Sequence, residues 1–171
     1  MQSPALNEFL KHNFGYDSFR PLQQEIISDI LAGCDLIAIL PTGAGKSICF
    51  QLPAIISNKV AVVVSPLIAL MKDQVDQLVS NGVEATFINS SLAPAEAYQR
   101  MRDLRAGRYR LVYVAPERLM MENFLEELSR LPLAFFAIDE AHCISEWGHD
   151  FRPEYRELGK LRTIFPKTPI V

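Results

Sequence analysis

The sequence predicts an α/β domain in which helices cover both faces of a mostly parallel sheet. Short apolar runs of strand length alternate with amphipathic helical segments along the 171 residues, and this alternation is typical of parallel sheets. A glycine-rich turn follows the apolar run at 35–40, and two adjacent acids follow the apolar run at 133–138. Because ligands of such sheets bind at the carboxyl ends of the strands, the turn and the acids are expected at the same edge.

The strands are predicted from their apolar runs. The run at 60–64 contains only valine and alanine, as expected for a strand that is covered on both faces. A further strand is expected to begin at 169–171. The other runs read as strands are 35–40, 85–88, 111–115 and 134–138.

Three helices are predicted between these strands, and the first two have recognisable boundaries. The first is expected to use Ser65 as its cap and Pro66 as its first residue, and to end near Gly82. The second is expected over 93–106, with Pro94 marking its start and Gly107 its end. The third carries an apolar stripe at helical spacing, which we interpret as core packing. Its residues are Phe124, Leu125, Leu128 and Leu131.

The glycine-rich turn resembles a phosphate-binding loop with one departure. The strict pattern G-x-x-x-x-G-K-[ST] requires a glycine where this chain has Leu40. Backbone N–H groups and a helix N-terminus would still face phosphate oxygens, with Lys46 reaching the β- and γ-phosphates and the Ser47 hydroxyl binding Mg²⁺. The alternative is an ordinary turn, but a lysine in the first helical turn is unfavourable without an anion. The predicted loop consists of Pro41, Thr42, Gly43, Ala44, Gly45, Lys46 and Ser47.

The paired acids complete a site for nucleoside triphosphate hydrolysis. Asp139 is expected to hold Mg²⁺ through water, and Glu140 to orient and deprotonate the attacking water. The alternative is that both acids are only solvated residues of a turn. The phosphate loop earlier in the chain favours the functional role. His142 is expected to hydrogen-bond across the cleft as a neutral imidazole, and its alternative role is packing alone.

Composition narrows the class of protein. The formal net charge of −3 argues against a nonspecific basic nucleic-acid coat, and no apolar stretch is long enough to span a bilayer. Cys34, Cys49 and Cys143 lack metal-site spacing and adjoin apolar segments. We therefore expect reduced core cysteines of a cytosolic protein and no zinc site in this segment.

Further motifs give the chain a specific resemblance. The segment at 14–23 reads FGYDSFRPLQ, and the segment at 143–155 reads CISEWGHDFRPEY. With SPL at 65–67, APERL at 115–119 and the two phosphate-site motifs, the whole chain closely resembles the first motor lobe of RecQ-type DNA helicases of superfamily 2. The resemblance implies a three-layer RecA-like lobe of a 3′-to-5′ ATP-dependent DNA helicase in repair and recombination. It also implies ATP and Mg²⁺ as cofactors and single-stranded and partly duplex DNA as partners.

The resemblance also assigns ligand-binding residues. Tyr16 and Arg20 would flank the adenine ring, and the Gln23 amide would pair with its Hoogsteen edge, since an amide matches the N6 donor and N7 acceptor. Without the resemblance, Gln23 reads as a helix-surface residue. The 143–155 segment would couple DNA binding to hydrolysis by stacking on bases and contacting phosphate, although by itself it reads as packed structure. The residues assigned to DNA are Ser65, Pro66, Arg118, Trp147, His149, Phe151 and Arg152.

The resemblance implies that 1–171 is an incomplete first lobe. The chain stops at Val171, where the family continues into a Ser/Thr-Ala-Thr motif, and the second lobe, zinc-binding, winged-helix and HRDC regions are absent. We expect weak ATP–Mg²⁺ binding, no unwinding by this piece alone, and a location in the bacterial cytoplasm with the nucleoid. A nucleic-acid-binding or ATP-sensing switch and an unrelated phosphotransferase are the alternatives.

Overall fold

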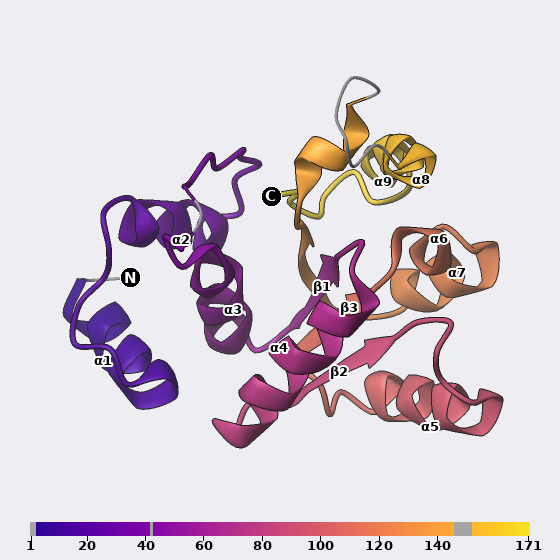
Figure 1. Ribbon diagram of the computed structural model, residues 1–171, viewed down its shortest axis with the longest axis horizontal. Helices are drawn as coiled ribbons and strands as arrows, with labels where there is room; N and C mark the ends of the chain where they lie inside the picture. Colours follow the sequence, from indigo (N-terminus) through magenta and orange to yellow (C-terminus); the bar gives the residue numbers. More distant parts are fainter. Residues whose placement is uncertain (1–2, 42, 146–151) are drawn as a thin grey trace.

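The computed structural model describes residues 3–41, 43–145 and 152–171, and its centre is a parallel sheet (Figure 1). The strands lie in the order β2-β3-β1-β4, and all neighbouring pairs are parallel. Val62 of the central strand is in register with both Val112 and Phe136. The predicted α/β class with a parallel sheet is therefore confirmed. The strands are β1 (Val60–Val64), β2 (Ala85–Ile88), β3 (Leu111–Val114) and β4 (Leu133–Ile138).

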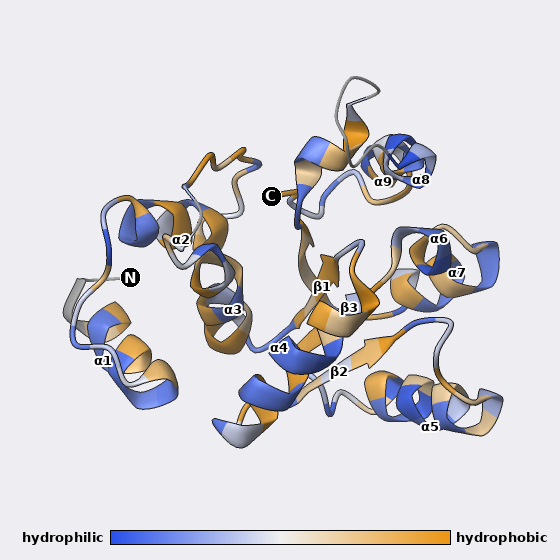
Figure 2. Cartoon of the chain, in the orientation of Figure 1, coloured by the Kyte–Doolittle hydropathy of each residue, from blue (hydrophilic) through white to orange (hydrophobic). Residues whose placement is uncertain are grey.

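Helices cover both faces of this sheet and make it a three-layer structure. Successive side chains of a strand point to opposite faces, so Val62 packs in one hydrophobic core with α5 to α9, and Val63 packs in another with α2, α3 and α4. The strands are mostly orange in Figure 2, whereas the helices show both orange and blue. The longer helices are α1 (Ser3–Phe14), α2 (Gln23–Leu31), α3 (Lys46–Ser57), α4 (Ile68–Ser80), α5 (Pro94–Arg105) and α7 (Glu122–Ser129). The shorter ones are α6 (Pro116–Leu119), η1 (Ala141–Ile144), α8 (Pro153–Glu157), η2 (Leu158–Lys160) and α9 (Leu161–Ile164).

The strand predicted at 35–40 is not formed, and this prediction was wrong. The Leu36 N–H donates to the Ile170 carbonyl at 3.3 Å, but no strand is assigned over 35–40, and Ile37 and Ile39 are each 90% exposed. Residues 169–171 do pair with β4, and they lie between that strand and Leu36. A strand needs a hydrogen-bonding neighbour, and within the described chain the run finds one only at its beginning.

The start of α4 also differs from the prediction. The helix begins at Ile68 after an extended Leu67, so Ser65 and Pro66 lie outside it. The Ser65 N–H donates to the Val114 carbonyl at 3.1 Å, which keeps Ser65 in line with β1 rather than at a helix cap. By contrast, α5 over Pro94–Arg105 lies within one residue of the predicted limits at each end, and Pro94 is its first residue.

The cysteines are free thiols, and two of them are buried as predicted. Cys49 and Cys143 are buried, but Cys34 is exposed, which contradicts the expectation of a core position. Cys34 lies in the loop between α2 and the run at 35–40, and this loop stays outside the sheet. Among the described helices, none combines the length and apolar character that crossing a membrane requires.

Candidate nucleotide-binding site

The glycine-rich loop leads directly into helix α3. Gly43 and Gly45 both adopt left-handed backbone conformations, with φ of 78° and 77°. Residues other than glycine rarely adopt this conformation. The helix begins at Lys46, so Lys46 and Ser47 occupy its first turn. This arrangement places a helix N-terminus and a lysine at the loop, as anion binding requires. Thr42 of the predicted loop lies outside the described residues.

The residues expected to read adenine lie against the same loop. Gln23, at the start of α2, is 1% exposed, and its Nε2 donates to the carbonyls of Ala44 and Gly45 at 3.1 Å each. Its Oε1 accepts the Arg20 N–H at 2.9 Å, and the Arg20 guanidinium donates to the Gly43 carbonyl. The structure thus brings Arg20 and Gln23 to the phosphate loop, but the Gln23 amide is bonded to protein.

Tyr16 completes a small hollow beside these residues. A cavity of about 60 Å³ is lined by Tyr16, Arg20, Gln23 and Gly45, among others, and Tyr16 is 51% exposed. The structure therefore places Tyr16 beside Arg20 and Gln23, the two other residues expected to bind adenine.

The paired acids extend from the end of β4. The Asp139 N–H donates to the Val64 carbonyl at 2.9 Å, which continues the pairing with β1. Glu140 has a left-handed backbone with φ of 52°, and its N–H donates to Asp139 Oδ1 at 3.0 Å. The Glu140 carboxylate lies 3.9 Å from Lys46 Nζ and 3.2 Å from His142 Nδ1. Four residues predicted to be catalytic are therefore brought together.

The environment of Asp139 makes its charge unfavourable. Burial raises the pKa of this carboxyl above its ordinary value of 3.8, and the neighbouring Glu140 raises it further. The Glu140 backbone N–H, Lys46 and His142 act in the opposite direction. A divalent cation at this position would favour the ionised form.

A magnesium ion suits the oxygen atoms available here. Ser47 offers a hydroxyl and Asp139 a carboxylate, and Mg²⁺ usually binds one or two protein oxygens together with phosphates and water. In the part of the chain that the structure describes, no group of three or more His, Cys, Asp or Glu side chains forms a candidate metal site. One hydroxyl and one carboxylate fit a cation that also binds phosphate and water oxygens.

Sequence reasoning missed Tyr155 and Gln51. The Tyr155 hydroxyl of α8 donates to the Asp139 carbonyl at 2.8 Å, and its side chain is 1% exposed. Nothing in the sequence indicates this contact, because the two residues are 16 positions apart. Gln51 donates a hydrogen bond to Gln74 of α4. Its spacing of four residues from Ser47 puts both on one face of α3.

Two of the described residues assigned to DNA, Ser65 and Pro66, are buried. Ser65 is 2% exposed and Pro66 is buried, at the end of β1. The Arg118 guanidinium lies 5.3 Å from the Phe124 ring centroid, and its Nη1 is 3.3 Å from the Met121 sulfur. Among the described residues, Arg118 Nε has no hydrogen-bond partner. The side chains of Ser65 and Pro66 would have to become exposed before they could contact a DNA strand.

Arg152 is the described end of the aromatic segment. Its backbone N–H donates to the Cys143 carbonyl at 2.9 Å, which holds the start of α8 against η1. The remaining DNA-binding predictions lie outside the described residues; they are Trp147, His149 and Phe151.

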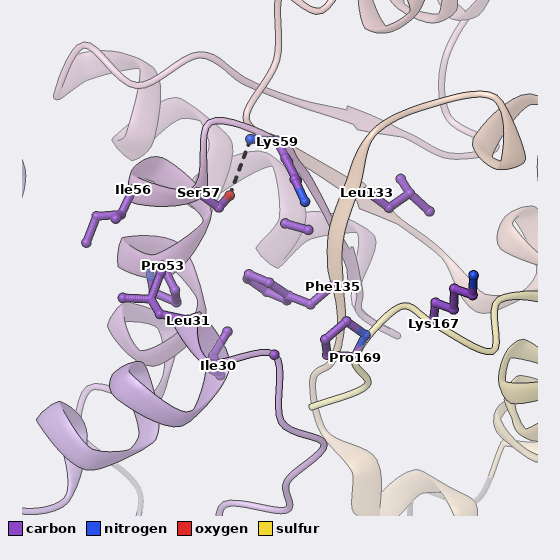
Figure 3. Close-up of a pocket in the computed structure, with 12 residues that line it drawn as sticks. Ile30, Leu31, Pro53, Ile56, Ser57, Lys59, Leu133, Phe135, Lys167 and Pro169 are labelled. Atoms are coloured by element: carbon purple, nitrogen blue, oxygen red, sulfur yellow. Dashed lines mark hydrogen bonds between the residues drawn. The ribbon is translucent and has the colours of Figure 1, made fainter. Parts of the chain in front are cut away.

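A larger cavity lies at the other end of β4 (Figure 3). It has a volume of about 400 Å³ and is bordered by Leu31, Pro53, Phe135 and Pro169. Phe135 precedes Asp139 by four residues, roughly 13 Å along a strand. This cavity is therefore separate from the phosphate loop and the acids.

A RecA-like sheet with a glycine-rich loop at a helix start and paired acids at a strand end defines a lobe of the phosphate-binding NTPase class. The family profile described as DEAD/DEAH box helicase matches residues 20–171, and the chain therefore belongs to this family.

Curated relatives confirm the resemblance to RecQ-type helicases. The chain is 48% identical over 171 residues to the ATP-dependent DNA helicase RecQ of Haemophilus influenzae, covering all of this chain and 28% of that protein. It is 51% identical over 158 residues to the Pasteurella multocida helicase of the same name, covering 92% of this chain and 25% of that protein. The chain thus spans about a quarter of the length of these relatives.

Solved structures show the same fold at lower identity. A hypothetical ATP-dependent RNA helicase from Sulfolobus tokodaii superposes with a TM-score of 0.69 at 18% identity, covering 99% of this chain and 49% of that chain. The DUF1998 helicase MrfA bound to DNA and AMPPNP has a TM-score of 0.68 at 22% identity, covering 83% of this chain and 22% of that chain. These similarities support the RecA-like fold.

Proposed function

We propose that residues 1–171 are the first ATP-binding lobe of a RecQ-type 3′-to-5′ DNA helicase, which acts in DNA repair and recombination. One observation carries this proposal: Lys46 at the start of α3 and Glu140 after β4 are 94 positions apart in sequence, yet their charged groups lie 3.9 Å from each other. A phosphate-binding lysine and a base that activates water must meet at the same phosphate for hydrolysis. The RecQ relatives supply the expected substrate, which is DNA.

In the proposed reaction the nucleotide phosphates bind at residues 43–47, and Lys46 exchanges its contact with Glu140 for a phosphate oxygen. Glu140 then takes a proton from the attacking water, and His142, 3.2 Å from its carboxylate, orients it. Ser47 and Asp139 would hold Mg²⁺, which neutralises developing charge on the phosphates. Stacking by Tyr16 and Arg20, and hydrogen bonds from Gln23, would select adenine.

The whole protein is proposed to need parts beyond this lobe. A second motor lobe would supply arginine fingers, which contribute about 10³–10⁵ in rate in related NTPases. Ser65, Pro66, Arg118 and Arg152, together with the aromatic segment, would contact single-stranded or partly duplex DNA. We also propose a location in the cytoplasm with the nucleoid, because the relatives are named as DNA helicases and come from bacteria.

ATP hydrolysis with and without single-stranded DNA tests the proposal, on this chain and on the same chain extended through a second motor lobe. Glu140→Gln keeps the shape of the side chain but removes the base, so we expect bound ATP and a loss of turnover of about 10²–10⁴-fold in the longer protein. Glu122→Gln, at an exposed position of α7, is the matched control and keeps turnover. Normal turnover of Glu140→Gln would overturn the catalytic assignment, and hydrolysis without DNA dependence would favour a switch-type ATPase.

A further inference from the structure

A line of hydrogen bonds joins the phosphate-loop helix to the middle of the sheet. Ser47 Oγ accepts from Gln74 Nε2 of α4 at 3.4 Å, and Gln74 Oε1 accepts from Gln51 Nε2 of α3 at 3.4 Å. Gln51 Nε2 also donates to the Tyr113 hydroxyl of β3 at 2.9 Å. The hydrogen bonds therefore run in series from β3 through α3 and α4 to the hydroxyl that is expected to bind Mg²⁺.

The far end of this line is rigidly held. Tyr113 is 1% exposed and Gln51 is 6% exposed, and Tyr113 lies in register with Val63 and Phe87 of the neighbouring strands. Burial raises the pKa of the Tyr113 phenol, so its hydroxyl stays protonated at neutral pH. A buried amide that loses its partner is unfavourable, so the bond to the Tyr113 hydroxyl holds the Gln51 side chain in place.

The orientation of Gln51 in turn sets that of Gln74. The Gln51 amide nitrogen carries two N–H groups, and the one that does not bind Tyr113 donates to the Gln74 carbonyl oxygen. With its oxygen engaged there, the Gln74 amide nitrogen is directed at Ser47. Gln74 is therefore held between the buried Gln51 and the Ser47 hydroxyl.

We propose that Gln74 is a positioning residue for the cation site: it holds the Ser47 hydroxyl so that a lone pair faces the divalent cation of a bound nucleotide. A hydroxyl oxygen has two lone pairs and one proton. The Gln74 N–H takes one lone pair, which leaves the other for the cation and the proton for a further acceptor. This inference rests on the proposed function, because it assigns a residue of the same nucleotide site.

The same helix provides a matched control. Gln77 lies one turn after Gln74 on α4 and is exposed, whereas Gln74 is half-buried. Methionine has nearly the length of glutamine and a similar helix propensity but no N–H donor. Gln74→Met removes the contact with Ser47, and Gln77→Met makes the same chemical change on the solvent side.

The experiment measures ATP binding to this chain by titration calorimetry, with Mg²⁺ and with the metal chelated. We expect Gln74→Met to weaken binding in Mg²⁺ by about two- to fivefold, as for loss of one long neutral hydrogen bond. Binding without Mg²⁺ should be unchanged, and Gln77→Met should bind as the unchanged chain does. In a Ser47→Ala background, Gln74→Met should have no further effect, since the hydroxyl that it holds is gone.

Three results would overturn the role of Gln74: unchanged affinity in Mg²⁺, equal losses with and without the metal, or additive losses with Ser47→Ala. If the unchanged chain shows no ATP binding that depends on Mg²⁺, the proposed function fails first and the role of Gln74 fails with it. Thermal melting by circular dichroism checks that each variant folds. Gln74→Ala replaces Gln74→Met in the same comparison if that variant is unfolded.

Discussion

Replacing Gly45 with alanine should destabilise the fold more than the same change at Gly43, although both glycines have the same backbone conformation. Their φ angles are 77° and 78°. A Cβ atom at Gly45 would lie 2.6 Å from Gln23 Nε2, whereas one at Gly43 would meet nothing within 4 Å. Gln23 is 1% exposed, so it has little room to withdraw. The pair of variants therefore separates backbone strain from the contact with Gln23.

The magnitude follows from two contributions. A left-handed conformation costs an alanine about 1–2 kcal/mol at either position. At Gly45 the added methyl also displaces the Gln23 amide from the carbonyls of Ala44 and Gly45, now 3.1 Å away. Each lost bond costs about 0.5–1.5 kcal/mol. The expected loss is about 2–5 kcal/mol for Gly45→Ala and about 1–2 kcal/mol for Gly43→Ala. The smaller entropy of the unfolded alanine chains affects both variants alike.

Urea unfolding followed by circular dichroism measures this difference. With a slope of about 2 kcal/mol per molar urea, the midpoint of Gly45→Ala should lie about 0.5–1.5 M below that of Gly43→Ala. Gln23→Ala removes the obstructing amide, so in that background the two alanine variants should lose equal stability. Equal midpoints in the original background would refute the reasoning, because the Gln23 contact would then cost nothing.

Two further predictions concern the acid loop. Burial raises the pKa of Asp139, so its carboxylate lowers the stability of the fold as pH rises above about 3.8. Asp139→Asn should therefore raise the melting temperature at neutral pH, with a gain that shrinks as pH falls towards about 4. A gain in melting temperature that does not depend on pH would contradict the assignment. Tyr155→Phe removes the 2.8 Å hydrogen bond to the Asp139 carbonyl and should cost about 1–2 kcal/mol in urea unfolding. Tyr98→Phe, at a side chain 65% exposed, should be neutral, and equal midpoints for both variants would argue against this bond.

The sheet was predictable because the residues of each strand are themselves apolar enough to indicate a buried strand. Every residue of β1 is apolar and buried, and a run of that kind has few alternatives to a covered strand. Pro94 and Gly107 delimit α5 in the same local way, through restricted φ at one end and a left-handed turn at the other. The loop and the acids were recognisable for the same reason, since each is a short contiguous segment.

Features that depend on distant partners were not predictable. The apolar run at 35–40 has the composition of a strand, but composition cannot show whether a neighbour is available to pair with it. Ser65 has the chemistry of a helix cap, yet its N–H continues the pairing of β1 with β3. The Gln51 and Tyr113 side chains meet across 62 positions, so only the folded structure shows that they are partners.

The contacts of the site also bear on how tightly it can bind a nucleotide. Gln23 donates to two loop carbonyls, and Lys46 lies beside Glu140. A nucleotide that binds as proposed would exchange these contacts, so its affinity would be the free energy of the new bonds less that of the bonds given up. The exchange at Lys46 has a second consequence, because a phosphate that binds the lysine would also free the Glu140 carboxylate from its contact at 3.9 Å. Binding of the nucleotide and release of Glu140 would then be one event at the end of β4.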